Sequence, residues 1–150
     1  MVAEPRGVVG DELRAIGERL LAAASEARAY GLAAAHIGEI APVVIVSGDP
    51  EGREYMLLFN PVVTAVAIET ETGEEGSVSA PGVRIQLDRP VWAEVAYMDE
   101  SGASQTARFE RFAARVALHE IEQMNGVFFL NKLSRLKREI VLKKAKKHAE

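Results

Sequence analysis

Two adjacent residues, His119 and Glu120, have side chains that could do chemistry together. An imidazole can hold a metal ion, and a neighbouring carboxylate can take a proton from a metal-bound water. The alternative is that His119 is a buried histidine bonded to a carboxylate and Glu120 a helical surface residue.

The composition limits what any site can contain. The sequence has 0 cysteines, which removes disulfides, thiol nucleophiles and thiolate ligands. Its 3 histidines are His36, His119 and His148, so a metal site must draw on these, on carboxylates or on weak neutral oxygens. Histidine titrates near neutral pH, so general acid–base work is open to His36. Ser77 is a poor candidate nucleophile, because no Ser–His–acid arrangement is recognisable around it.

Length and hydropathy indicate an ordinary globular protein. The 150 residues fit one domain, and a hydrophobic fraction of 48% is typical of a packed core. No apolar stretch is long enough to span a bilayer, so we expect no membrane partner. Residues 1–10 lack a basic segment followed by an apolar run, which argues against a signal peptide and for the cytoplasm. We expect residues 1–10 to be poorly ordered.

Charge is distributed unevenly along the chain. The net charge is -4, yet residues 132–150 hold eight Lys and Arg against two Glu, a net +6, which leaves −10 for residues 1–131. A basic helix over residues 134–148 on an acidic body predicts a polyanionic partner such as RNA; we expect no DNA partner. The alternative is an ordinary solvated helix face.

Helices are indicated at three places. Apolar residues at three- and four-residue intervals predict a helix over Asp11–Tyr30. A second is predicted over Phe112–Met124, with its stop at Asn125–Gly126. Ser134 is a suitable cap for a third helix that runs to about Lys147.

Short apolar or alternating runs between the helices predict strands. The expected strands are Val43–Ser47, Tyr55–Phe59, Val62–Ile68, Val91–Tyr97 and Gln105–Phe109, the last two joined as a hairpin. Glu69–Gly76 is expected to be an acidic turn. A helix, several strands and two further helices are typical of the α+β class with an antiparallel sheet.

Four segments in register resemble the peptide deformylase family from about residue 11 to the end. They are Gly31–Gly38, Glu75–Val83, His119–Gly126 and Phe129–Glu139. The resemblance implies a single domain over residues 1–150, with antiparallel sheets around a central helix that carries His119 and with a C-terminal helix. Family enzymes remove the formyl group from the N-terminal formylmethionine of new proteins.

The resemblance also implies a metal site. In the family, iron or zinc is held by one cysteine and two histidines, and a glutamate between the histidines is the acid and base. His119 and Glu120 match the first histidine and the glutamate, whereas Ser77 stands at the cysteine and Gln123 at the second histidine. A neutral hydroxyl and a neutral amide bind such ions weakly. We therefore expect no metal or a weakly held divalent ion, and weak or lost deformylase activity.

His36 stands where the family has a glutamine that holds the developing oxyanion, together with a backbone amide that matches Val78. Because this side chain points toward the metal in the family, His36 is a candidate replacement ligand beside His119. The alternative function is thus a deformylase or amidase with a rewired site and bound iron, zinc, nickel or cobalt. A metal-free activity through Glu120, His36 and Ser77 ranks last, because amide cleavage without a metal or nucleophile is slow.

Binding residues follow from the same resemblance. Tyr30 matches the wall of the pocket for the methionine side chain, and Val116 is a candidate for the same wall or for ordinary core. Gly31 and Gly76 match glycines where substrate backbone approaches closely. A non-catalytic module that binds a peptide N-terminus is therefore a further alternative. In bacterial members the C-terminal helix can dock on ribosomes, which makes the ribosome a candidate partner of the basic helix.

Overall fold

The fold surrounds one helix, α2, with two antiparallel sheets. The computed structural model describes residues 9–47, 54–77 and 80–149. The helices of this part are α1 (Asp11–Ala27), α2 (Phe112–Met124) and α3 (Arg135–Ala149), with short 3-10 segments η1 (Ala34–Ile37) and η2 (Phe129–Lys132). The strands are β1 (Gly31–Ala33), β2 (Val43–Ser47), β3 (Tyr55–Val66), β4 (Thr70–Ser77), β5 (Ala80–Pro90), β6 (Trp92–Met98) and β7 (Ser104–Glu110).

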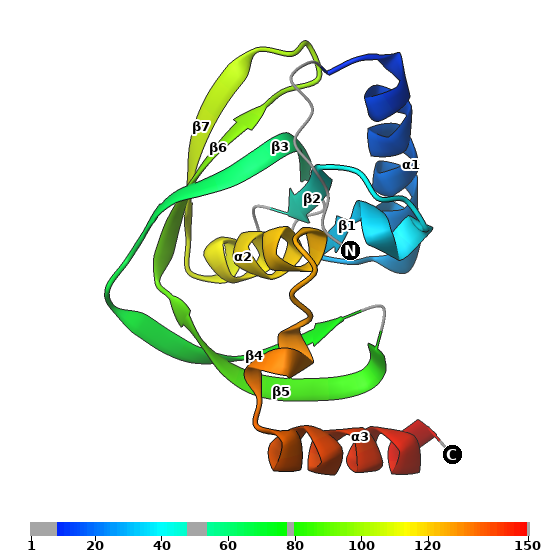
Figure 1. Cartoon of the computed structure of the whole chain (residues 1–150), viewed down its shortest axis with the longest axis vertical. Helices are drawn as coiled ribbons and strands as arrows, with labels where there is room; N and C mark the ends of the chain where they lie inside the picture. Colours follow the sequence, from blue (N-terminus) through cyan, green and yellow to red (C-terminus); the bar gives the residue numbers. More distant parts are fainter. Residues whose placement is uncertain (1–8, 48–53, 78–79, 150) are drawn as a thin grey trace.

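The strands form two sheets. Five of them pair in the order β1-β2-β3-β6-β7, while β4 and β5 form a separate two-stranded ribbon. Each pairing is antiparallel. Figure 1 shows α2 between the five-stranded sheet and the ribbon, with α3 on the other side of the ribbon. The predicted α+β class and the C-terminal helix are thus confirmed.

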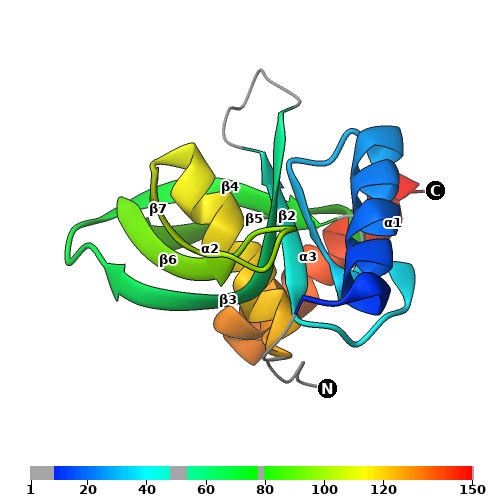
Figure 2. The same cartoon turned by 90° about the horizontal axis from the view of Figure 1, so that it is seen from above.

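Strand β2 lies at the centre of the packing, and both of its faces are buried. Val44 and Val46 face α2, within a cluster that includes Ala117 and Ile121. Residues of the opposite face pack against α1, which covers the other side of the sheet (Figure 2). A strand that is apolar on both faces has a continuous run of hydrophobic residues in the sequence. For this reason β2 was predicted with its observed ends.

The helix predictions hold with one difference. Helix α2 spans Phe112–Met124 as predicted. The backbone N–H of Lys137 donates to Ser134 Oγ at 3.2 Å, so the predicted cap of α3 is present. Helix α1 ends at Ala27, three residues before the predicted end, because Arg28 adopts a left-handed conformation with φ 53°.

The strand predictions were wrong in two places and omitted the short strand β1, which pairs with β2. Tyr55–Val66 is one strand that continues through Pro61, since a bulge between Phe59 and Val62 absorbs the break in pairing. The stretch predicted as an acidic turn forms β4, paired with β5, which was not predicted. The alternation over residues 83–89 was a usable signal, because Val83, Ile85, Leu87 and Arg89 are buried and the residues between them are exposed.

The expectation that residues 1–10 are poorly ordered falls mostly on residues that the structure does not describe. Residues 1–8 lie outside the described residues, but Val9 is buried in the cluster beneath α1. Within the described part of the chain, no helix combines the length and apolar character needed to cross a membrane.

Candidate functional site

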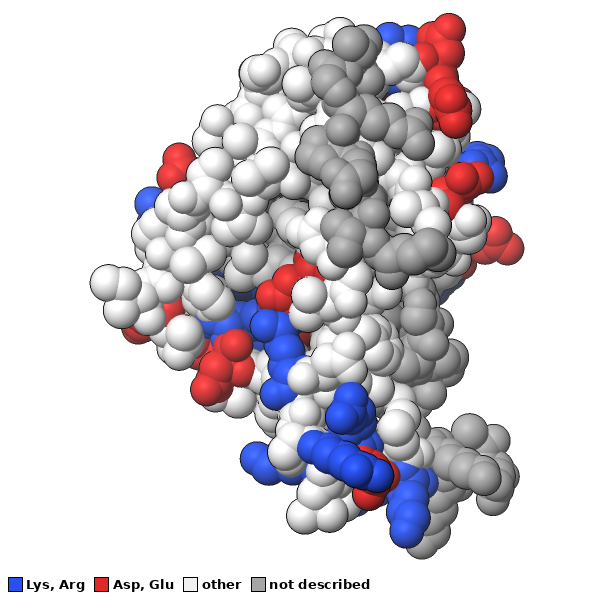
Figure 3. Space-filling model, viewed as in Figure 1, with Lys and Arg blue, Asp and Glu red and all other residues white. Residues whose placement is uncertain are grey.

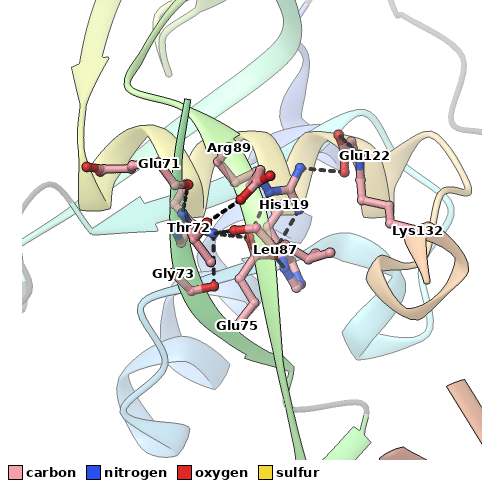
Figure 4. Close-up of polar contacts among 11 residues, drawn as sticks. Glu71, Thr72, Gly73, Glu75, Leu87, Arg89, His119, Glu122 and Lys132 are labelled. Carbon is pink, nitrogen blue, oxygen red and sulfur yellow. Dashed lines mark hydrogen bonds and ion pairs between the residues drawn. The ribbon is translucent and has the colours of Figure 1, made fainter. Parts of the chain in front are cut away.

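The carboxylate of Glu75, on β4, lies at the centre of a buried polar network with α2 (Figure 4). Its Oε1 accepts hydrogen bonds from His119 Nδ1 at 2.9 Å and from Arg89 Nη2 at 2.8 Å. Its Oε2 accepts from Arg89 Nε and from Arg115 Nη1, both at 2.7 Å. Burial alone raises the pKa of Glu75, but the hydrogen bonds from Arg89 and His119 outweigh burial and lower the pKa to about 2.

The network extends to the end of α2 and to η2. Arg89 Nη1 donates to Glu122 Oε1 at 2.8 Å, and Glu122 Oε2 forms an ion pair with Lys132 at 3.1 Å. Glu122 thus links α2, β5 and η2. The cause is the short loop after α2, which returns Lys132 to the helix from which Glu122 projects.

His119 is fixed by its carboxylate partner. Because Glu75 accepts the bond, Nδ1 carries the hydrogen, and the neutral ring presents the Nε2 lone pair on its other side. Burial lowers the pKa of His119, but the hydrogen bond to Glu75 and the charge of Glu120 outweigh burial and raise it. The interpretation of His119 as a buried histidine bonded to a carboxylate is confirmed, and it is compatible with a ligand at Nε2.

Glu120 and Gln123 each keep a buried oxygen without a hydrogen bond in the described structure. These atoms are Glu120 Oε1 and Gln123 Oε1, one turn apart on α2. Burial raises the pKa of Glu120 to about 7, and the negative charge of Glu75 adds to this. Glu120 is therefore buried, contrary to its surface interpretation, and is poised to hold or release a proton near neutral pH.

The other predicted site residues lie around β1. The backbone N–H of Ala33 donates to His36 Nδ1 at 3.0 Å. Burial lowers the pKa of His36 and the charge of His119 lowers it further, against the opposite effect of the hydrogen bond with the backbone of Ala33. Tyr30 is 40% exposed and packs edge-to-face on Phe112, at 4.9 Å between ring centroids.

The two predicted substrate glycines have close neighbours within the protein. A Cβ on Gly31 would lie 2.6 Å from Val116 Cγ1 and 2.9 Å from the Cγ of Glu120, so this glycine lets α2 approach β1. A Cβ on Gly76 would lie 2.3 Å from Nη1 of Arg84. Substrate contact at these positions stays a prediction. Ser77 ends β4, but its side chain and all of Val78 lie outside the described residues.

Sequence reasoning missed Arg89, Arg115 and the central role of Glu75. Residues two apart on a strand share a face, so Gly73 and Glu75 would have been placed together had β4 been predicted as a strand. Arg115 lies one turn before His119, which places both on one face of α2. These residues could therefore have been found by combining the two-residue period of a strand over β4 with the helical period of α2.

The donors present do not fit a tightly held iron or zinc ion. Among the described residues, no three His, Asp or Glu side chains are grouped so that they could hold a metal. The buried Oε1 of Gln123, four residues after His119 on α2, carries no charge and would be a weak metal ligand. A serine hydroxyl at position 77 would also be neutral and hard, whereas these metals favour imidazole and thiolate.

Comparisons with known proteins give one consistent result. A family model described as polypeptide deformylase matches residues 2–139. A protein named peptide deformylase-like from Agrobacterium fabrum is 37% identical over 146 residues, which cover 97% of this chain and 88% of that protein. A peptide deformylase from Phenylobacterium zucineum is 34% identical, with 99% of this chain and 89% of that protein covered.

Solved structures agree with the sequence comparisons. The crystal structure of peptide deformylase from Ehrlichia chaffeensis matches with a TM-score of 0.89 and 25% identity over 99% of this chain and 89% of that chain. A peptide deformylase from Synechococcus elongatus in complex with actinonin matches with a TM-score of 0.87 and 31% identity, over 96% and 80% of the two chains.

Proposed function

Because the chain belongs to the polypeptide deformylase family, we propose that it binds peptide N-termini beside His119 and that its metal-dependent deformylase activity is weak or lost. The observation that carries this proposal is that the site keeps a histidine and a glutamate but has an uncharged amide at a second ligand position. His119 and Glu120 are buried and His119 is bonded to Glu75, whereas Gln123 offers only a neutral oxygen. The proposed place of action is the cytoplasm, where new N-termini arise.

The binding half of the proposal is supported by the polar atoms around His119. Glu120 Oε1 and Gln123 Oε1 are buried acceptors without partners among the described residues, and a buried unpaired acceptor costs free energy until a donor reaches it. The N–H groups at a peptide N-terminus are donors of the required kind. In the family, a bound metal supplies an activated water; the donors here do not fit that ion, so no step is assigned to it.

Metal analysis together with a formyl-peptide assay tests this function. The protein is purified with iron, nickel, cobalt and zinc supplied in turn, and metal content and hydrolysis of a formylmethionyl peptide are measured on the same samples. We expect metal contents well below one equivalent, with binding of the peptide detectable by calorimetry. One equivalent of metal with rapid turnover would show that the family's activity is intact.

A second candidate is a metal enzyme with a rewired site, in which His36 of η1 joins His119 as a ligand. The charge on His119 contributes to the lowered pKa of His36, after the larger effect of burial. This candidate predicts that the substitution His36→Ala removes bound metal and activity together. A protein that hydrolyses formyl peptides equally well with and without His36 would rule it out.

A ribosome partner for α3 remains a proposal of its own. Figure 3 shows Lys and Arg side chains gathered over this helix at one end of the molecule. Val141 packs against an apolar cluster and anchors one side of the helix; the cluster consists of Val83, Ile85 and Leu87 of β5 with Phe129 and Leu130 of η2. The exposed basic side chains with described positions are Arg135, Lys137, Lys143 and Lys144. A polyanionic surface such as ribosomal RNA has the matching charge.

A further inference from the structure

The guanidinium of Arg115 fills the space between α2 and β4 next to Gly73. A Cβ on Gly73 would lie 2.8 Å from Arg115 Cζ and Nη2 and 2.9 Å from Nε. The Arg115 side chain is only 9% exposed. The two residues therefore form a matched pair, in which the missing side chain of Gly73 makes room for the large side chain of Arg115.

Protein atoms hold this guanidinium in place. Nη1 donates to Glu75 Oε2 at 2.7 Å and to Leu87 O at 2.9 Å, with a longer contact to Gly73 O at 3.4 Å. Nη2 donates to Glu71 O at 2.9 Å. Acceptors from both strands of the β4–β5 ribbon thus bind one side chain of α2. Arg115 serves as a fixed wall of the site, because its terminal nitrogens are already engaged.

The filled space adjoins the candidate site. Arg115 lies four residues before His119 on the same face of α2, and both side chains donate to Glu75. Val116, the next residue, covers Gly31 on β1. On the β4 side of α2, the space next to His119 is thus occupied by a buried cation, and a side chain that entered this space would have to displace the four hydrogen bonds of Arg115.

We propose that Arg115 determines specificity by filling this space, so that the site takes peptides whose first side chain is short, as in glycine or alanine, instead of a long apolar one such as methionine. The inference rests on the proposed function, namely that a peptide N-terminus binds beside His119. Displacing Arg115 would leave Glu75 with fewer partners and an unpaired cation, and a methionine side chain can replace neither hydrogen bond nor charge.

Calorimetric binding of two tripeptides tests the preference. N-formyl-Gly-Ala-Ser and N-formyl-Met-Ala-Ser are titrated into the wild-type protein and into the variants Arg115→Ala and Arg115→Met. The wild type is expected to bind the glycyl peptide roughly tenfold more tightly or better, since a pocket that lacks space for a few methylenes discriminates by at least that factor. Arg115→Ala should abolish or reverse the preference, whereas Arg115→Met, which refills the space without charge, should keep it.

Arg111→Ala is the matched control for the arginine substitutions. Arg111 also projects from the start of α2 to β4, where it pairs with Glu71, but its side chain is 65% exposed. The control should leave the ratio of the two affinities unchanged. Equal affinity of the wild type for both peptides, or a ratio that Arg115→Ala does not change, overturns the inference while leaving the proposed function standing. Failure of both peptides to bind any variant overturns the proposed function and the inference with it.

Unfolding midpoints measured without peptide test directly whether Arg115 fills the space next to Gly73. Gly73→Ala should lower the unfolding midpoint in the wild-type background, because the added Cβ meets the guanidinium, and should lower it much less in the Arg115→Ala background. Equal losses in both backgrounds would mean that Arg115 does not fill the space. This double-mutant cycle decides the structural part even if Arg115→Ala weakens the fold, as long as the midpoints can be measured.

Discussion

The Glu75 carboxylate accepts four hydrogen bonds from Arg89, Arg115 and His119 in a buried position. Such a carboxylate has two roles, since it pairs with two guanidinium groups and fixes the ring of His119. Removing one partner from a buried ionic network leaves the opposite charges without compensation, which is far more costly than loss of an exposed pair.

Glu75→Gln is therefore expected to lower the free energy of unfolding by about 3 kcal/mol. The amide is isosteric, so the change removes charge and leaves the packing intact. Urea unfolding of the variant and the wild type measures the loss. Glu110→Gln, which removes the partner of Arg108 in an exposed pair, is the control and should have little effect. Similar effects of the two substitutions would refute the central place of Glu75.

The buried carboxyl of Glu120 predicts a dependence of stability on pH. Its pKa of about 7 in the folded protein exceeds the ordinary 4.5, so the folded state holds its proton while the unfolded chain ionises. Stability should fall as the pH rises between these values, by up to about 1.4 kcal/mol per pH unit, and level off above 7. Urea unfolding of the metal-free wild type and of Glu120→Gln over this pH range isolates the effect. A constant difference between the two proteins would refute it.

At the residue scale, the sequence predicts the pair His119–Glu120 but not the partners that hold it. The helical period and the resemblance both select these positions. Arg89 and Arg115 were not predicted as site residues, because an arginine on a polar strand or on an amphipathic helix normally faces solvent. Their burial depends on Glu75, a carboxylate forty residues before Arg115 in the sequence, and on the missing side chain at Gly73.

At the element scale, helix α2 begins at a strained residue. Arg111 has φ 53° and ψ −117°, a conformation that favours glycine. Its backbone N–H donates to Val91 O at 2.8 Å, which fixes the turn between β7 and α2. Arg111→Gly should raise the free energy of unfolding by about 1 kcal/mol relative to Arg111→Ala.

Both substitutions at Arg111 remove the exposed pair with Glu71, so their difference isolates the backbone strain. Chemical denaturation of the two variants measures that difference. If the alanine variant is as stable as the glycine variant, the turn is not strained and the observed conformation has another cause.

The elements that sequence patterns predict well are those with one clear period. Helix α2 and strand β2 have apolar patterns that match their burial, and their ends were predicted correctly. The β4–β5 ribbon was missed because its β4 strand is rich in Glu and Gly, which have low strand propensity. Tertiary contacts override that propensity here, since the ribbon brings Glu75 into hydrogen bonds with Arg89 and Arg115 and packs β5 against α3.

At the scale of the whole molecule, the basic face of α3 predicts binding to a polyanion. Lys137→Glu combined with Lys143→Glu and Lys144→Glu should reduce co-sedimentation with ribosomes, and the wild-type binding should weaken steeply with salt. Arg108→Glu on β7 changes a charge on another element and is the control. Co-sedimentation that is unaffected by the three substitutions would exclude α3 as the contact surface.

We have proposed that this chain holds metal weakly or not at all, because neutral side chains stand at two of the family's three ligand positions. Restoring them tests it most directly: the zinc content of the wild type is compared with that of the double variant Ser77→Cys, Gln123→His after the same metal supplementation. We predict little zinc in the wild type and about one equivalent in the variant. A wild type that already holds a full equivalent, or a folded double variant that holds none, would contradict the account.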